Sequence, residues 1–171
     1  NPSRSYVLSV LAFTGLTDVI VVAYKDTGSL TIQIVQYRPG NGTATLIKSL
    51  STTGHSGVVH LSELSLGAAN TPTLGVGFSS SGVCGNKAYF VESVSGAFAA
   101  NTLTEITDTS FPPNQATPKY IVGPLVQLNE NIYIMTKDGE IYNSELTAGG
   151  DAQLTNWDDS GFVSASSNND Y

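Results

Sequence analysis

The feature of this sequence that most restricts its fold is an internal repeat. Turn-type glycines stand at positions 28, 82 and 139, and each separates two short runs of β-forming residues. Around each turn the chain supplies about four such runs. Three units therefore follow one another over residues 5–52, 57–108 and 119–158, with a short C-terminal tail. A repeat of this length predicts one supersecondary unit per period, which stacks on its neighbours to bury its apolar faces.

The runs themselves indicate β-strands joined by tight turns. In the third unit, an Asp-Gly pair at 138–139 separates apolar alternations at 131–135 and 140–142, which is a strong β-hairpin signal. The other two strands of this unit are expected at 120–125 and 153–157. No stretch of the chain keeps a helical apolar period for more than about two turns. We therefore predict an all-β chain.

Four-stranded antiparallel units at this period are typical of β-propeller blades, which stack around an axis and cover one another's faces. We predict one all-β domain over residues 1–171, built of about three propeller-like repeats. The alternative is a β-sandwich of about twelve strands in which the repeat is accidental. Residues 61–69 fit a strand as well as a turn of helix.

The number of units predicts association. Propellers typically have four to eight blades, so three blades are too few to close a ring. Two chains of three blades would close a six-bladed ring. Alternatively, the chain is one part of a larger complex, or a processed fragment whose other blades are missing. A start at Asn1 rather than Met fits a processed product.

Composition indicates the compartment and excludes some partners. The chain has 14 acidic and 7 basic residues and a net charge of -7, which argues against nucleic-acid binding. The chain is rich in Ser, Thr and Asn and poor in Lys, which is typical of secreted or cell-surface proteins. Asn41-Gly42-Thr43 is an N-glycosylation pattern in a turn-like stretch, so we expect a glycoprotein modified at Asn41. No apolar run approaches the ~20 residues of a membrane span, and we expect no membrane insertion.

The one cysteine of the chain, Cys84, lies at an expected hairpin tip. In an oxidising compartment such a residue either is buried and inert, or forms a disulfide with another chain or with a missing part of its own. Its place at a hairpin tip favours exposure, so an intermolecular disulfide is one of the three interpretations that remain open.

The third unit resembles a known family. Its hairpin over 132–143, followed after a Gly-rich turn by Trp157, is similar to the blades of fungal fucose-specific lectins and of quinoprotein-like repeats. The lectin resemblance implies sugar pockets between blades, each built from an Arg, a Glu and an aromatic residue. Here the Arg position holds Tyr133 and the Glu position holds Asn143, while Trp157 stands where the aromatic residue belongs.

Trp157 and the two acidic residues after it have two interpretations. An indole stacks on a sugar while carboxylates accept hydroxyl hydrogen bonds, so this cluster is a candidate glycan site together with Tyr133 and Asn143. Alternatively, Trp157 caps the hydrophobic core of a blade. Tyr133 is equally a cross-strand packing residue.

Acidic residues gather after Lys137, the last basic residue. Such oxygen-rich loops can hold Ca²⁺, but they match no EF-hand, and a solvated acidic face also explains them. We predict no cofactor, with Ca²⁺ as the exception to test. The residues concerned are Asp138, Glu140, Glu145, Asp151, Asp158, Asp159 and Asp170.

Catalytic motifs are weak, and we predict no catalytic residue and no metal site. His55 and His60 are too few for a zinc site, and His55-Ser56 does not form a nucleophile elbow. Nothing in the sequence pairs two carboxylates at the spacing that glycosidases need.

We therefore predict a non-enzymatic extracellular protein that acts by self-association or as part of a larger surface complex. The alternatives are a lectin that uses Tyr133, Asn143 and Trp157, and a secreted carbohydrate-active enzyme.

Overall fold

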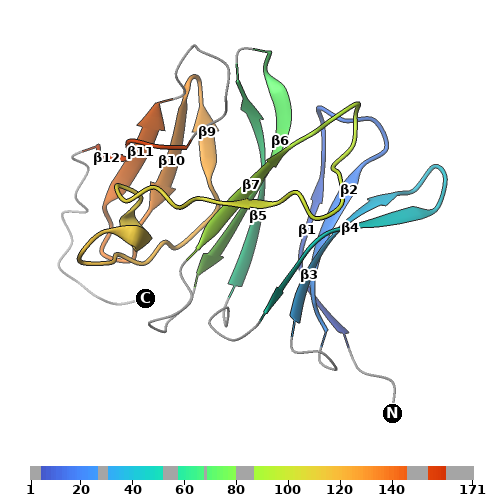
Figure 1. Ribbon diagram of the computed structural model, residues 1–171, viewed down its shortest axis with the longest axis horizontal. Helices are drawn as coiled ribbons and strands as arrows, with labels where there is room; N and C mark the ends of the chain where they lie inside the picture. Colours follow the sequence, from blue (N-terminus) through green and yellow to red (C-terminus); the bar gives the residue numbers. More distant parts are fainter. Residues whose placement is uncertain are drawn as a thin grey trace.

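The computed structural model describes residues 5–26, 31–51, 58–67, 69–79, 87–145 and 154–160. These residues form three four-stranded antiparallel sheets that follow one another along the chain (Figure 1). The predicted all-β class and the propeller-like series of three four-stranded sheets are confirmed.

Within each sheet the strands lie in sequence order, and neighbouring strands are antiparallel, as in a β-meander. The first sheet contains β1 (Ser5–Ala12), β2 (Ile20–Asp26), β3 (Thr31–Arg38) and β4 (Thr43–Ser51). The second contains β5 (Val58–Leu66), β6 (Thr71–Ser79), β7 (Ala88–Glu92) and β8 (Thr104–Glu105). The third contains β9 (Val126–Leu128), β10 (Asn131–Met135), β11 (Ile141–Glu145) and β12 (Asp158–Asp159). A 3-10 turn, η1 (Pro112–Asn114), lies in the connection between the second and third sheets.

The first strands of the three sheets lie together. β1 packs against β5, and β5 packs against β9. The sheets are splayed side by side from this line, with the second sheet in the middle (Figure 1). This is the arrangement of propeller blades, in which the first strand of each blade is the innermost one.

The core has two layers, one at each junction between neighbouring sheets. Between the first and second sheets, fully buried residues of β2 and β3 pack with buried residues of β6 and β7. Phe98, from the connection after β7, meets Phe13 edge-on with ring centroids 5.0 Å apart. The Phe98 backbone N–H donates to buried Gln36 Oε1 at 2.9 Å, so an otherwise costly buried amide is satisfied across the junction. The residues of this layer include Val21, Ala23, Ile32, Ile34, Leu74, Val76 and Phe78.

Between the second and third sheets, β5 and β7 pack against β10 and β11 together with the connection that precedes β9. Gly77 allows that connection to come close. A Cβ at Gly77 would lie 3.1 Å from the carbonyl oxygen of Gly123, tighter than ordinary packing. The residues of this layer include Leu64, Leu66, Ala88, Phe111, Ile121, Leu125, Ile132, Ile134, Tyr142 and Trp157.

Two expected strands of the third sheet are displaced. The first strand begins at Val126 rather than within 120–125, because Pro124 has no N–H to give to a ladder. Of the expected strand, Ile121 keeps only an isolated bridge to Thr136. The fourth strand is Asp158–Asp159 rather than 153–157.

Of the other predicted local features, some lie on residues that the structure describes and some do not. Residues 58–66 form a strand, β5, and not a turn of helix. Gly139 has a φ of +87°, which explains why its turn carries a glycine. Gly28 and Gly82 lie outside the described residues.

Candidate functional site

The first sheet exposes an apolar face on the side away from the second sheet. On β2 and β3, Val21 and Ile34 point into the core, so their neighbours Val22 and Val35 point outward. One row of register partners crosses all four strands: Val10, Val22, Val35 and Leu46. Val10 is 59% exposed and Leu46 is 40% exposed. We call these four residues, with Val7 and Tyr37, the first outer face.

The third sheet exposes a second apolar face, again on the side away from the middle sheet. Ile132 and Ile134 are buried toward the second sheet, which turns Tyr133 and Met135 outward. Their register partners on the neighbouring strands complete the face. We define the third outer face as Val122, Val126, Leu128, Tyr133, Met135 and Ile141.

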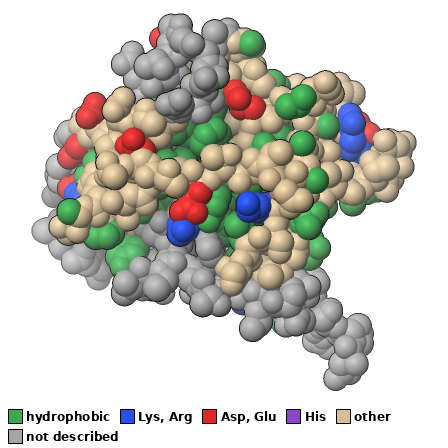
Figure 2. Space-filling view, viewed as in Figure 1, with side chains coloured by type: hydrophobic (Ala, Val, Ile, Leu, Met, Phe, Trp, Pro, Cys, Tyr) green, Lys and Arg blue, Asp and Glu red, His purple; other side chains and the backbone are tan. Residues whose placement is uncertain are grey.

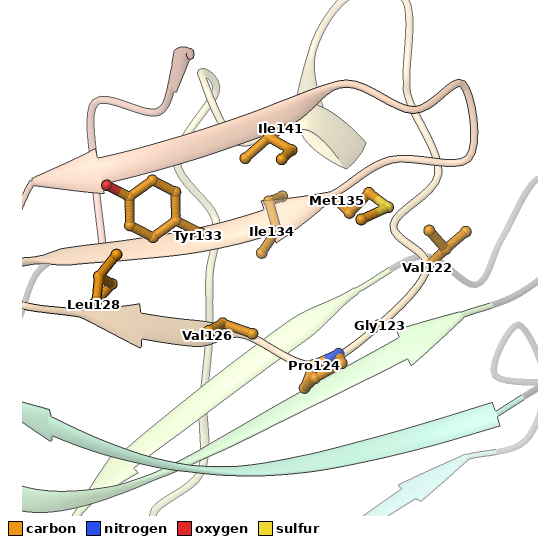
Figure 3. Close-up of a pocket in the computed structure, with 9 residues that line it drawn as sticks. All are labelled: Val122, Gly123, Pro124, Val126, Leu128, Tyr133, Ile134, Met135 and Ile141. Carbon is orange, nitrogen blue, oxygen red and sulfur yellow. The ribbon is translucent and has the colours of Figure 1, made fainter. Parts of the chain in front are cut away.

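The third outer face is hollowed into a groove of about 360 Å³. The Gly123-Pro124 turn forms one wall, and the side chains of β9, β10 and β11 form the floor (Figure 3). The tyrosine hydroxyl marks one end of the groove and Met135 lies toward the other. The nine lining residues include no carboxylate, ammonium, imidazole or thiol. Such a groove can bury apolar surface and accept or donate one hydrogen bond through Tyr133, but its lining offers no pair of groups for acid–base chemistry.

The structure brings together two of the three predicted ligand-binding residues. Tyr133 and Asn143 are register partners on β10 and β11, and both are half-buried. The Asn143 side-chain amide donates to Asn131 Oδ1 at 3.3 Å.

Trp157 is the exception, and its assignment is corrected. Its side chain is 3% exposed and packs on Phe111 with ring centroids 5.1 Å apart. The indole N–H donates to the Leu154 carbonyl at 3.1 Å, and the Trp157 backbone N–H donates to Ser110 Oγ at 2.6 Å. Because the ring belongs to the layer between the second and third sheets, it leaves no free face for a sugar.

Asn41 lies exposed in the turn between β3 and β4. Its Oδ1 accepts from the backbone N–H of Thr43 at 3.1 Å and from the Thr43 hydroxyl at 2.6 Å. The neighbouring Gly42 has a φ of +67°. Glycosylation of Asn41 stays a prediction. Cys84 lies outside the described residues, so the prediction of an intermolecular disulfide stays open as well.

Two of the late acidic residues share one lysine. Lys119 forms ion pairs with Glu140 and, at 3.7 Å, with Asp138. The hydrogen bond to Glu140 is the main cause that raises the pKa of Lys119. Tyr142 also donates to Glu140, at 3.0 Å. Within the part of the chain that the structure describes, no group of three or more His, Cys, Asp or Glu side chains is placed to hold a metal ion. Asp151 and Asp170 lie outside it.

A polar depression of about 570 Å³ lies where the first strands converge, and its main polar groups already bind protein atoms. Glu63 on β5 accepts from the backbone N–H groups of Thr14, at 2.9 Å, and Gly15, at 2.6 Å. Gln127 on β9 accepts from the Ser65 N–H at 2.5 Å and donates to the Ser65 carbonyl at 2.8 Å. These two side chains therefore fasten the first sheet to the second and the second to the third.

Charged side chains are few and scattered over the side of the molecule seen in Figure 2. The residues that define the two outer faces are uncharged.

The two outer faces were not predicted, although the sequence contains a signal for an apolar outer face. Residues 19–24 read Val-Ile-Val-Val-Ala-Tyr, which is apolar at both parities of the strand. A strand of this kind has apolar side chains on both faces, whereas a sheet with one solvated face alternates apolar and polar.

No protein-family model matches this chain, and no curated protein matches it. No helix among the described residues is long and apolar enough to cross a membrane.

Proposed function

We propose that this chain is a non-enzymatic assembly protein that associates with further copies of itself through the outer faces of its two end sheets. One observation carries the proposal. The middle sheet is buried on both faces, whereas each end sheet leaves one apolar face exposed. Soluble monomers rarely leave extended apolar patches uncovered, and larger ones mark interaction sites.

The chemistry of the two faces supports association over catalysis. Each face offers branched aliphatic and aromatic side chains at cross-strand spacing, and the groove lining has no charged group. Depletion of charge at the centre of a patch, with aromatic residues and Met present, is the composition of the core of a protein interface.

The proposed setting is extracellular, as a secreted or surface glycoprotein. The scarcity of Lys and the exposed Asn41-Gly42-Thr43 turn support this setting. A glycan at Asn41 would stand on the tip of the β3–β4 hairpin.

The test is the native mass of the purified chain, measured by multi-angle light scattering over about a hundredfold range of concentration. We expect a species heavier than the 17.9 kDa chain, with a population that rises with concentration. Parallel samples with and without reductant separate apolar association from a disulfide at Cys84. A chain that stays at the monomer mass throughout contradicts the proposal.

Glycan binding is the second candidate, favoured by the placement of Tyr133 opposite Asn143 on the third outer face. A phenol ring can stack on the face of a sugar, and a neighbouring amide can hydrogen-bond the hydroxyl groups of that sugar. A glycan array tests it, with Tyr133→Ala as the variant that loses binding and Tyr37→Ala, on the other outer face, as the matched control. An array without binders contradicts this candidate.

A further inference from the structure

We infer that two copies of this chain close into one six-sheet ring, in which the first outer face of each copy packs into the third outer face of the other. This inference rests on the proposed function and adds to it the pairing of faces and the number of copies. The argument starts from the two junctions that already exist inside the chain.

Both internal junctions join the same two kinds of face. Each sheet has a forward face, which is directed toward the next sheet in the chain, and a backward face on its other side. At each internal junction, the forward face of one sheet packs against the backward face of the next. Val21 and Ala23 of the first sheet thus meet Leu74 and Val76 of the second. Likewise, Gly77 and Ala88 lie on the forward face of the second sheet, and Ile132 lies on the backward face of the third.

The two exposed faces are the unmatched halves of such a junction. The first outer face is a backward face with no sheet before it among the described residues, and the third outer face is a forward face with no sheet after it there. Packing one against the other continues the series of junctions that the chain itself builds. Pairing two first outer faces, or two third outer faces, would join faces of one kind, an arrangement that neither internal junction contains.

The shapes of the two faces agree with this pairing. The first outer face presents a row of side chains, Val10 to Leu46, that runs across four strands. The third outer face is hollowed by its groove of about 360 Å³ (Figure 3). A row of branched aliphatic side chains set into an apolar groove buries more surface than two rows or two grooves placed face to face.

The number of copies follows from the number of sheets. Propellers close with about four to eight blades. With the three sheets that the described residues form, two copies supply six sheets, which lies within this range, and three copies supply nine, which does not. A head-to-tail interface that closes also stops growing, whereas one that does not close gives filaments.

The junction between copies differs from the internal ones in one respect. Glu63 and Gln127 each extend from a first strand to the backbone of the preceding sheet. Among the residues of β1 whose side chains the structure describes, Val7, Val10 and Ala12 face backward, and none of these three can form such a hydrogen bond through its side chain. The ring is therefore held by apolar contact and dissociates on dilution before the chain unfolds.

The experiment uses two charge substitutions, one on each outer face. Val35→Lys places a charge within the row of the first outer face, and Met135→Glu places a charge in the groove of the third outer face. Because the ring uses both faces, we expect either variant alone to raise the dimer dissociation constant at least about 10-fold. Val94→Lys is the matched control, since Val94 is 67% exposed, lies in the second sheet's β7–β8 connection and belongs to neither outer face.

Mixing the two variants tests the pairing directly. In a mixed ring, one junction contains both substitutions, Lys opposite Glu, and the other junction is wild type. We therefore expect equimolar Val35→Lys and Met135→Glu to form dimers more strongly than either variant alone. Far-UV circular dichroism and urea unfolding of each variant show whether it folds as the wild type does.

Each other outcome is decisive. If the wild type associates but only one variant weakens it, two like faces meet and the pairing inferred here is wrong. If the wild type grows beyond a dimer, the ring does not close. A wild type that stays monomeric contradicts the proposed function itself, and capture of a different partner by the same faces would then be the remaining use for them.

Discussion

The middle sheet and the two end sheets are built from similar strands, yet they differ in how much of each strand is buried. On β6 a continuous run of residues, 73–78, is buried, because the sheet is covered on both sides. On β3 burial alternates residue by residue from 31 to 36, because only one side is covered. The outward positions of β3 nevertheless include Val35 and Tyr37. The difference shows that the end sheets carry apolar side chains suited to a second covering layer that the described chain does not supply.

Truncation in the middle sheet is expected to have the largest effect on stability. Phe78 is 2% exposed and packs edge-on against Tyr89 with centroids 5.8 Å apart. Phe78→Ala removes the ring and leaves a cavity, at a cost of about 3–5 kcal/mol. Leu46→Ala, on the first outer face, is expected to cost less than about 1 kcal/mol in the monomer.

Urea unfolding at a concentration below that of association measures both values. Equal losses for Phe78→Ala and Leu46→Ala would show that the end sheet is as well covered as the middle one, and would remove the contrast between them.

Two glycines at the second junction give a narrower version of the same contrast. A Cβ at Gly77 would meet the Gly123 carbonyl oxygen, whereas a Cβ at Gly123 would have no heavy atom within 4 Å. We expect Gly77→Ala to cost about 1–3 kcal/mol, because the third sheet must move away from the second. Gly123→Ala, the matched control, is expected to be close to neutral. Thermal unfolding of the pair checks this, and a neutral Gly77→Ala would mean that the two sheets are not in close contact at that point.

The repeat and the turn residues made most of this fold predictable. Each unit is a local meander, so the apolar alternation of its strands and turns such as Asp138-Gly139 carry the signal within a few residues. In the third unit, the predicted positions of the first and last strands were wrong. Pro124 disrupts the first strand, and the last strand is only two residues long, too short to have a pattern of its own.

The groove is built from residues 122–141 alone. The contacts that join the sheets were less predictable, because their parts meet over long stretches of chain. Thr14 and Glu63 are 49 residues apart, and Ser65 and Gln127 are 62 apart, so no local pattern pairs them. Trp157 was ambiguous for a different reason. An indole beside carboxylates suits both a sugar platform and a core, and only the position of Phe111 and Leu154 around it decides in favour of the core.

Loss of the hydrogen bonds between Gln127 and Ser65, which join the second and third sheets, is expected to have a moderate effect on stability. Gln127→Ala removes both hydrogen bonds to Ser65 and leaves the Ser65 N–H and carbonyl to find water. The expected cost is about 1–2 kcal/mol. Because the amide does not titrate, this loss should be the same at every pH at which the protein folds. Urea unfolding at two pH values measures it, and a loss that grows on acidification would assign the effect to another group.

The stabilisation by Glu63, which joins the first and second sheets through Thr14 and Gly15, should instead depend on pH. Of the substitutions considered, the one at Glu63 is expected to have the smallest effect. Partial burial acts to raise the pKa of Glu63, but hydrogen bonds from Thr14 and Gly15 to its carboxylate outweigh it and lower the pKa below its ordinary value of 4.5. A carboxyl group with a lower pKa in the folded state stabilises the fold above the pKa of the unfolded chain, and this contribution is lost as pH falls through the folded pKa. The stabilisation by Glu63 is therefore complete at neutral pH and disappears in the range below 4.5.

Glu63→Gln keeps a hydrogen-bond acceptor and removes the charge. We expect it to cost on the order of 1 kcal/mol at neutral pH, since the group is partly exposed to solvent. The gap between variant and wild type should close as pH is lowered from about 6 to about 3. Parallel urea curves across that range measure the gap, with Gln127→Ala as the control whose gap stays constant. If the Glu63→Gln gap also stays constant, the charge of Glu63 does not stabilise the first junction, and the lowered pKa of its carboxyl group has no counterpart in the stability of the fold.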